Sequence, residues 1–168
     1  MTENTNLERA ALLLDLLKRH QLSIAFAESI TGGLLAATLT RIPGASSALL
    51  GSLVCYNRES KIRLLEVPEK LLLEKGAESE EVTRAMAEGL SGKFPEASLL
   101  LAITGAASAP VNEYQISSSP GQVFICFGQP GSALISRQEK LSGTREEVLE
   151  KAVSFAFDCL IDLIRKET

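Results

Sequence analysis

Apolar residues recur at the three- and four-residue spacing of an amphipathic helix in several segments of the chain. The first segment begins at a capping box, in which Thr5 is followed three residues later by Glu8, and we expect a helix of roughly 14 residues ending near His20. Further helices are predicted over residues 34–41, 57–65, 67–73, 79–93 and 144–164. In the last helix we expect one buried face, made of Val148, Ala152, Phe155, Cys159 and Leu163.

Continuous apolar runs between these helices are typical of buried strands. We predict strands over residues 22–27, 51–56, 97–103 and 122–127, with residues 133–141 as the hairpin partner of the last one. Residues 106–120 form a polar segment that is too long for a simple connection. Because helices and strands alternate along most of the chain, we predict an α/β fold, a three-layer sandwich with a mixed, mostly parallel sheet flanked by helices. The chain, 1–168, is expected to be a single domain.

Composition and charge narrow the class of protein. With 45% hydrophobic and 23% charged residues, the 168-residue chain has enough apolar material for a packed core, which excludes a disordered protein. The net charge of −4 and the lack of any run of Lys or Arg argue against a nucleic-acid partner. No apolar stretch reaches the roughly 18 residues that span a bilayer, and the polar N-terminus is unlike a signal peptide. We therefore expect no membrane partner and a cytoplasmic location.

Histidine and cysteine are too few and too scattered for two common kinds of catalytic site. His20 is the single histidine, and the three cysteines, Cys55, Cys126 and Cys159, lie far apart with no CxxC spacing. A zinc site usually needs three or four ligands at short spacings, and a Ser-His-Asp triad would depend on His20 alone. We therefore expect no metal site, and reduced, buried thiols.

The first candidate site is the segment from Glu28 to Gly33, which follows a predicted strand and opens a helix. The unpaired N–H groups of a helix start, together with the hydroxyls of Ser29 and Thr31, can bind a phosphate or a carboxylate. Glycine lets such a ligand approach the backbone closely. The alternative is that Ser29 or Thr31 is only a helix cap.

The second candidate is the segment from Tyr56 to Lys61, again just after a strand. A serine nucleophile without histidine needs another base, and a neutral lysine can serve. A free lysine has a pKa of about 10.4, so lowering it to neutral pH requires about 4 kcal/mol of destabilisation of the charged form. Burial or a neighbouring cation such as Arg58 would supply it. The alternative is a lysine on a solvated helix face.

Two further candidates lie at the ends of predicted elements. Thr104 and Gly105 come at the carboxyl end of the strand over 97–103, where α/β sheets bind ligands, although they also fit an ordinary strand-to-loop junction. Arg145 lies near the start of the last helix and could clamp a phosphate. Its alternative is a surface ion pair with Glu147 or Glu150.

Five stretches of the chain together resemble the CinA C-terminal domain family, whose standalone members are nicotinamide-nucleotide amidases. The stretches are AESITGGLLAA (27–37), PGASSALLGSLVCYNRESK (43–61), GAESEEVTRAMAEG (76–89), LLLAITG (99–105) and SGTRE (142–146). The resemblance implies hydrolysis of nicotinamide mononucleotide to nicotinate mononucleotide and ammonia in pyridine-nucleotide recycling. It also implies that no metal or cofactor is needed, that the partner is a small mononucleotide substrate, and that the protein is a homo-oligomer, a dimer or a tetramer.

The resemblance also implies a role for each matching residue. Ser29 is expected to be the nucleophile and Lys61 its base, with Tyr56 assisting proton transfer or orienting the pair. Backbone donors for the oxyanion or the phosphate are expected from Thr31, Gly32 and Gly33. The residues expected to hold the nucleotide are Ser46, Thr104, Gly105 and Arg145.

The chain departs from the family pattern mainly in residues 106–120, where a glycine-rich stretch is largely replaced by other residues. Arg58 stands where the family has asparagine, and Ile30 where it usually has cysteine. Two hypotheses follow from these departures. The first is an active amidase of the Ser-Lys type. The second is a member with altered or lost activity that binds a nucleotide or regulates another protein.

Overall fold

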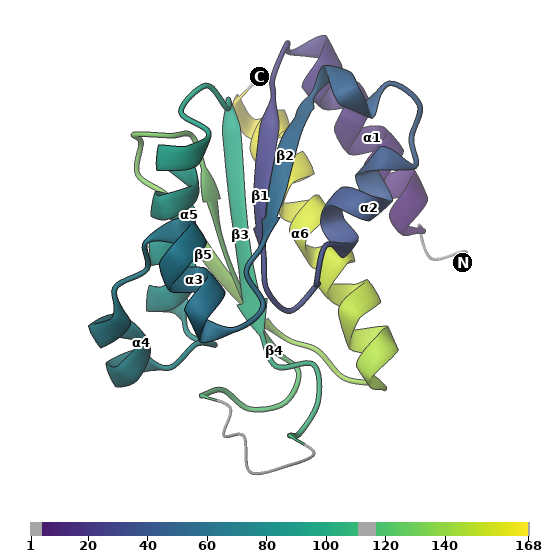
Figure 1. Ribbon diagram of the computed structural model, residues 1–168. Coiled ribbons are helices and arrows are strands. Elements are labelled where there is room, and N and C mark those ends of the chain that lie inside the picture. The colour runs from purple at the N-terminus through teal and green to yellow at the C-terminus, as the bar shows by residue number, and fades with distance from the viewer. Residues whose placement is uncertain (1–4, 111–116, 168) are drawn as a thin grey trace.

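The computed structural model describes residues 5–110 and 117–167 and contains a five-stranded sheet in the order β2-β1-β3-β4-β5 (Figure 1). The strands are β1 (Ile24–Glu28), β2 (Leu49–Val54), β3 (Leu99–Gly105), β4 (Gln122–Gly128) and β5 (Ile135–Lys140). Strand β1 pairs in parallel with β2 and β3, whereas β4 is antiparallel to both β3 and β5. Four strands therefore run in one direction and β4 alone runs in the other.

Helices cover both faces of the sheet (Figure 1). They are α1 (Asn6–Arg19), α2 (Leu34–Thr40), the 3₁₀ turn η1 (Ala45–Ser47), α3 (Arg58–Leu65), α4 (Glu69–Lys75), α5 (Glu80–Lys93) and α6 (Arg145–Glu167). One apolar cluster joins α1, α2 and α6 to one face of the sheet, and a second joins α3, α4 and α5 to the other. The predicted three-layer α/β sandwich with a mixed, mostly parallel sheet is confirmed.

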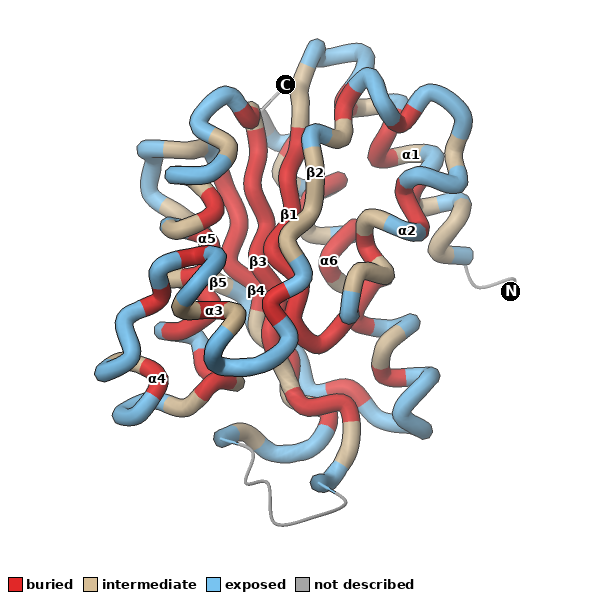
Figure 2. Tube along the Cα trace, in the orientation of Figure 1, coloured by how far each residue is buried: buried red, intermediate tan, exposed pale blue. Residues whose placement is uncertain are grey.

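Strand β1 shows why two layers form. All five of its residues are buried, and their side chains alternate between the two faces. Ile24 and Phe26 enter the core beneath α1, α2 and α6, whereas Ala25 and Ala27 enter the core beneath α5. Figure 2 shows the buried part of the chain concentrated in β1, β3 and β4. A strand that is buried on both faces has a continuous apolar sequence, and this feature made β1 and β3 predictable.

Most predicted elements are confirmed with shifted ends. Both capping boxes form: Glu8 with Thr5 at 2.6 and 3.3 Å, and Glu147 with Thr144 at 2.6 and 3.3 Å. Strand β2 begins two residues before the predicted segment and ends before Cys55, and the pairing register shifts between Ile24 and Ala25 of the neighbouring β1. Part of the predicted loop, residues 111–116, lies outside the described residues.

The predicted buried face of the last helix is partly wrong. Val148 and Ala152 are buried as expected, but Phe155, Cys159 and Leu163 are only half-buried. The predicted stripe lies along one side of the face that packs on the sheet, so only its first two residues are fully buried and the other three pack at the margin of the core. The residues of α6 that fill the core are Val148, Ala152, Val153, Ala156, Phe157, Leu160, Ile161 and Ile164.

The strand directions bring separate segments of the chain to one edge of the sheet, at the bottom of Figure 1. Strands β1, β2, β3 and β5 all end at this edge because they run in the same direction. Ser29, Cys55, Ala106 and Leu141 are the first residues after these strands. We call this edge the carboxyl edge. Ligands of open α/β sheets bind at such an edge, so it is the place to look for a site.

Candidate active site

Ser29 and Lys61 meet at the carboxyl edge of the sheet. The Nζ atom of Lys61 lies 2.8 Å from the hydroxyl oxygen of Ser29. Ser29 is held directly after β1, where its N–H donates to the carbonyl of Ile103 at 3.1 Å. Lys61 is in the first turn of α3, whose start is fixed by a capping box between Asn57 and Ser60. Two sequence segments 32 residues apart thus supply a nucleophile and a base within hydrogen-bonding distance.

The amine of Lys61 is almost completely enclosed, since the residue is only 1% exposed. Besides Ser29, it lies 2.8 Å from the carbonyl oxygen of Cys55 and 3.4 Å from that of Tyr56. Carbonyl oxygens can only accept hydrogen bonds. A neutral amine has two N–H bonds and one lone pair, so when the carbonyls take both N–H bonds the lone pair is left for the hydroxyl of Ser29. The alternative of a solvated lysine is therefore wrong.

Burial is the main reason why the pKa of Lys61 is lowered from 10.5 to about 8. The charges of Glu78 and, to a smaller extent, Cys55 oppose this shift and raise the pKa. Arg58 lowers it further but has the smallest effect of these groups, because its side chain is exposed on α3. Lys61 thus has a substantial neutral fraction near physiological pH, and enclosure rather than a neighbouring cation produces it.

Glu28, the last residue of β1, carries a fully buried carboxylate with five hydrogen-bond donors around it. Its Oε2 atom accepts from the Thr31 hydroxyl at 2.7 Å and from the N–H groups of Gly33 and Leu35 at 3.1 and 2.9 Å. Its Oε1 atom accepts from the Ala36 N–H at 3.0 Å and from the Ser52 hydroxyl at 2.9 Å. The start of α2 is therefore capped by a carboxylate of the chain itself.

These hydrogen bonds change the role predicted for Gly32 and Gly33 as backbone donors, whereas the backbone N–H of Thr31 stays available for it. The hydroxyl of Thr31 and the N–H of Gly33 are engaged by Glu28, and the N–H of Gly32 donates to the Ser29 carbonyl at 3.1 Å. The glycines instead provide backbone shape, because Gly32 and Gly33 have φ values of 58° and 105°, which side chains disfavour. Within the described residues, the N–H groups of Ile30 and Thr31 have no hydrogen-bond partner.

Arg145, the first residue of α6, joins two other segments of the chain. Its guanidinium donates to the hydroxyl of Tyr56 at 2.9 Å and to that of Ser108 at 3.0 Å. The predicted alternative, a surface ion pair with Glu147 or Glu150, is replaced by these contacts. The Tyr56 hydroxyl thus bonds to Arg145, while only the backbone carbonyl of Tyr56 contacts Lys61.

Thr104 and Gly105 end β3 beside this site. Thr104 is fully buried, and its hydroxyl lies 2.7 Å from that of Thr83 on α5, which in turn donates to the carbonyl of Ser79 at 2.6 Å. Gly105 lies so close to β4 that a Cβ atom there would be 2.5 Å from the Gln122 carbonyl oxygen. In this structure Thr104 fixes β3 against α5, and Gly105 allows β3 and β4 to approach each other.

Ser46 is the one predicted site residue that the structure places elsewhere. It lies in η1, just before β2, and β2 runs in parallel with β1 toward the carboxyl edge. Ser46 is therefore at the opposite edge of the sheet, a strand length of about 20 Å away. Within one chain it cannot contact the same small molecule as Ser29.

Three side chains of this region were given no role by sequence reasoning: Glu28, Glu78 and Ser108. The sequence does contain a signal for the role of Glu28. It is the one carboxylate in an otherwise apolar strand, and the helix that follows has no Ser, Thr, Asp or Asn at its N-cap position. Glu78 accepts from the N–H and the hydroxyl of Ser117 at 3.0 and 2.6 Å. Nothing in the local sequence pattern indicates that contact, because 39 residues separate the two positions.

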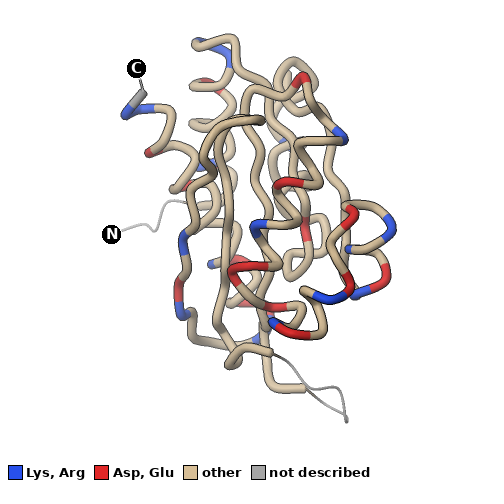
Figure 3. The backbone as a smooth tube through the Cα atoms, turned by 90° about the vertical axis from the view of Figure 1, so that its left-hand side faces the viewer, with Lys and Arg blue, Asp and Glu red and all other residues tan. Residues whose placement is uncertain are grey.

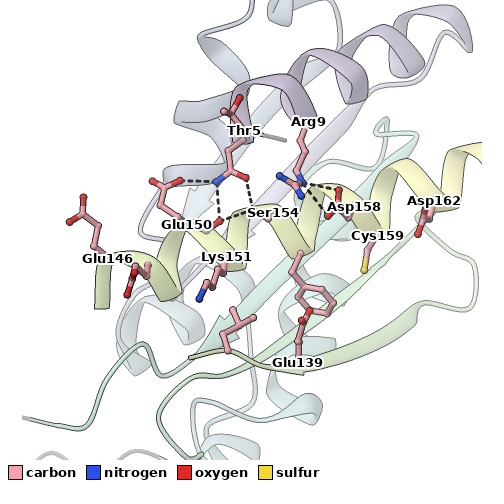
Figure 4. A pocket seen from close by; sticks show the side chains of 14 residues that line it. Thr5, Arg9, Glu139, Glu146, Glu150, Lys151, Ser154, Asp158, Cys159 and Asp162 are labelled. Atoms are coloured by element: carbon pink, nitrogen blue, oxygen red, sulfur yellow. Dashed lines mark hydrogen bonds and ion pairs between the residues drawn. The ribbon is translucent and has the colours of Figure 1, made fainter. Parts of the chain in front are cut away.

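A wide hollow of the described surface lies away from Ser29, between α1, β5 and α6 (Figure 4). This outer groove has a volume of about 980 Å³. An ion pair between Arg9 and Asp158, at 3.0 Å, crosses one side of it. The side chains that line the groove also include Glu139, Leu141, Glu146, Glu150, Phe155, Cys159 and Asp162. The groove contains none of the predicted site residues.

Three further observations concern charge, metal ligands and membrane-spanning helices. Lysines and arginines are scattered over the molecule with acidic residues between them (Figure 3). Among residues 5–110 and 117–167, no three His, Cys, Asp or Glu side chains are grouped so that they could hold a metal ion. No helix in the same ranges combines the length and the apolar character that crossing a membrane requires.

The family to which this fold and site correspond is shown by sequence comparison. The model of the CinA C-terminal domain matches residues 6–164. The chain belongs to the CinA C-terminal domain family. A CinA-like protein of Petrotoga mobilis is 38% identical over 154 residues, which are 92% of this chain and 37% of that protein. The chain thus spans about a third of the length of the curated relatives that it matches.

Solved structures of CinA-family proteins share the fold. A competence or damage-inducible protein from Enterobacter asburiae has a TM-score of 0.87 at 28% identity, covering 96% of this chain and 99% of that one. A CinA superfamily protein from Escherichia coli has a TM-score of 0.87 at 28% identity, covering 97% and 92%. These names state no chemical activity of the proteins that carry them.

Proposed function

We propose that this CinA-domain chain is an amidohydrolase that converts nicotinamide mononucleotide to nicotinate mononucleotide and ammonia. The observation that carries the proposal is the 2.8 Å contact between Ser29 and a Lys61 amine that is buried and has a pKa of about 8. The family resemblance of the motifs around both residues supplies the substrate. A serine activated by an adjacent base is the arrangement used for acyl transfer.

Acylation begins with the neutral Lys61. As the Ser29 oxygen attacks the carboxamide carbon, its proton moves to Nζ, whose lone pair faces it when the carbonyls of Cys55 and Tyr56 accept the two N–H bonds. The tetrahedral intermediate then collapses: the C–N bond breaks, Lys61 returns the proton to the leaving nitrogen, and ammonia departs. Ser29 is left as an ester of the nicotinate group.

Deacylation uses the same base. A water molecule gives a proton to Lys61 and attacks the ester carbon, and the bond between that carbon and the Ser29 oxygen breaks as Lys61 protonates Ser29. The products are nicotinate mononucleotide and the regenerated serine. The oxyanion of both tetrahedral intermediates is assigned to the backbone N–H groups of Ile30 and Thr31, which lie beside the nucleophile and lack other partners among the described residues.

The phosphate of the substrate is assigned to Arg145. The N–H groups at the start of α2, the other anion site suggested by the sequence, are already bonded to Glu28. Arg145 is exposed, and its partners Tyr56 and Ser108 are neutral hydroxyls that a phosphate can replace. The predicted role of Ser46 in nucleotide binding requires a second copy of the chain, in line with the expected homo-oligomer. Light scattering of the purified protein measures whether a second copy is present. The KM of Ser46→Ala for nicotinamide mononucleotide measures whether Ser46 contributes to binding.

The experiment that tests the proposal is ammonia release from nicotinamide mononucleotide by purified protein, beside Ser29→Ala. We expect release by the wild-type protein and none above background by the variant. The altered segment 106–120 favours the second hypothesis, a nucleotide-binding member without this activity. If the wild-type protein releases no ammonia, a thermal shift with mononucleotides but not with free ribose would support that hypothesis instead.

A further inference from the structure

We infer that Glu28 is a positioning residue for the nucleophile: its buried carboxylate holds the turn over residues 29–33 in one shape. That shape sets where the Ser29 hydroxyl and the N–H groups of Ile30 and Thr31 point. The inference rests on the proposed role of Ser29 in amide hydrolysis. It assigns to Glu28 a part in the reaction although its carboxylate is bonded to other groups of the protein and not to Ser29.

The contacts of Glu28 join three elements around the nucleophile. Thr31 and Gly33 belong to the turn itself, Leu35 and Ala36 to the first turn of α2, and Ser52 to the neighbouring strand β2. The backbone of Glu28 is fixed as well, since it pairs with β2 and β3 through Val54 and Ile103. A short turn between a rigid strand and a capped helix has little freedom left, so Ser29 is held in place before substrate arrives.

The donor set requires a carboxylate at this position. Three of the five donors are backbone N–H groups, which can only donate. A carboxylate is acceptor-only on both oxygens, whereas the amide of glutamine would turn an NH₂ group toward N–H donors on one side. Glutamine has nearly the same shape as glutamate, so Glu28→Gln changes the hydrogen bonding of the turn with little change in volume.

The effect of Glu28 is separable from the acid–base chemistry of Lys61. The charged groups that shift the pKa of Lys61 are Glu78, Cys55 and Arg58, and Glu28 is not among them. Removing the charge of Glu28 should therefore misplace the nucleophile without altering the ionisation of its base. A shift of about 1 Å in a reacting group can reduce a rate by about a hundredfold.

The test is Glu28→Gln in the full chain, with two readouts. The first is the rate at which a fluorophosphonate probe labels Ser29, followed by mass spectrometry, because this rate needs no particular substrate. The second is the pH dependence of kcat and KM for nicotinamide mononucleotide. We expect labelling and kcat to fall about a hundredfold, KM to stay within threefold, and the ascending limb of the pH profile to remain where it is in the wild-type protein.

The outcomes separate the two proposals. If wild-type Ser29 is labelled and Glu28→Gln is labelled about a hundredfold more slowly, the positioning role stands even when neither protein hydrolyses nicotinamide mononucleotide. Labelling of folded Glu28→Gln within threefold of wild type would overturn the inference, as would no labelling of wild-type Ser29 or a displaced pH limb in the variant. Circular dichroism checks that the variant is folded.

A matched pair of milder variants covers the case in which Glu28→Gln does not fold. Thr31→Val and Ser52→Ala each remove one hydroxyl that donates to Glu28, one in the turn and one on β2. We expect Thr31→Val to slow labelling of Ser29 at least tenfold and Ser52→Ala to slow it by a smaller factor, because Ser52 lies outside the turn. Equal labelling rates in both variants and the wild type would overturn the inference.

Discussion

The Ser29–Lys61 site and the outer groove contain the same kinds of side chain in opposite surroundings. The groove is a hollow of about 980 Å³ lined by many charged side chains, and the side chains of its ion pair between Arg9 and Asp158 are 20% and 53% exposed. Lys61 is 1% exposed. Water screens this ion pair, whereas enclosure makes Lys61 a base near neutral pH.

The thiol in the groove supports the same conclusion. Burial raises the pKa of Cys159 to about 11, which leaves almost no thiolate at neutral pH. Loss of water thus inactivates an acid such as Cys159 as a nucleophile and activates a cation such as Lys61 as a base. Enclosure of the right group, and not the size of a hollow, distinguishes the candidate active site in this molecule.

The largest expected effect comes from removing either member of the Ser-Lys pair. Ser29→Ala and Lys61→Met should each lower kcat/KM for nicotinamide mononucleotide by about a thousandfold or more, because one group cannot act without the other. Asp158→Asn and Glu146→Gln in the outer groove serve as controls and should stay within twofold of wild type. If a groove variant abolished ammonia release, the outer groove and not the Ser29–Lys61 pair would be the site of the reaction.

The free energy of unfolding should reveal the cost of enclosing Lys61. Its folded pKa of about 8 lies below the unfolded value of 10.5, so between these pH values the unfolded chain binds one more proton than the folded chain. Stability from this group therefore rises with pH across that window and is lowest below pH 8. Relative to Lys61→Met, wild-type protein should gain about 2 to 3 kcal/mol between pH 7 and pH 10 in denaturant titrations. An unchanged difference would mean that Lys61 is solvated.

A somewhat smaller effect is expected in the pH–rate profile. With a pKa of about 8 for Lys61, kcat/KM should rise about tenfold from pH 7 to pH 9 and then level off. The Glu78 carboxylate raises this pKa, so Glu78→Gln should move the ascending limb to lower pH. An ascending limb near 10.5 in the wild-type protein would contradict the assignment of Lys61 as the base.

The smallest effect is expected from the ion pair of the outer groove. Asp158→Asn should change the free energy of unfolding by less than about 1 kcal/mol, because one partner is more than half exposed. Thermal unfolding in low and high salt measures both the size of the effect and its screening. A decrease of several kcal/mol in the free energy of unfolding would show that the Arg9–Asp158 pair is shielded from water, as Lys61 is.

The sequence predicted the elements well where periodicity and end signals agreed. The capping boxes at Thr5 and Thr144 and the N-cap at Ser79 are local, and all three form as expected. The buried face of α6 was partly wrong at Phe155 and Cys159, because several faces of a long apolar helix are nearly equivalent in sequence. Only packing against the sheet chooses between them.

For the candidate site too, some features could be predicted from the sequence and others could not. The residue types of the site could be predicted from the sequence: a serine follows one strand, a lysine follows the next, and the single histidine leaves lysine as the candidate base. The tertiary structure decided that Lys61 is enclosed, that Glu28 rather than a ligand caps α2, and that Ser46 lies at the other edge of the sheet. The physical reason is that hydrogen bonds and desolvation depend on distances across the sheet, which parallel strands set between residues far apart in the chain.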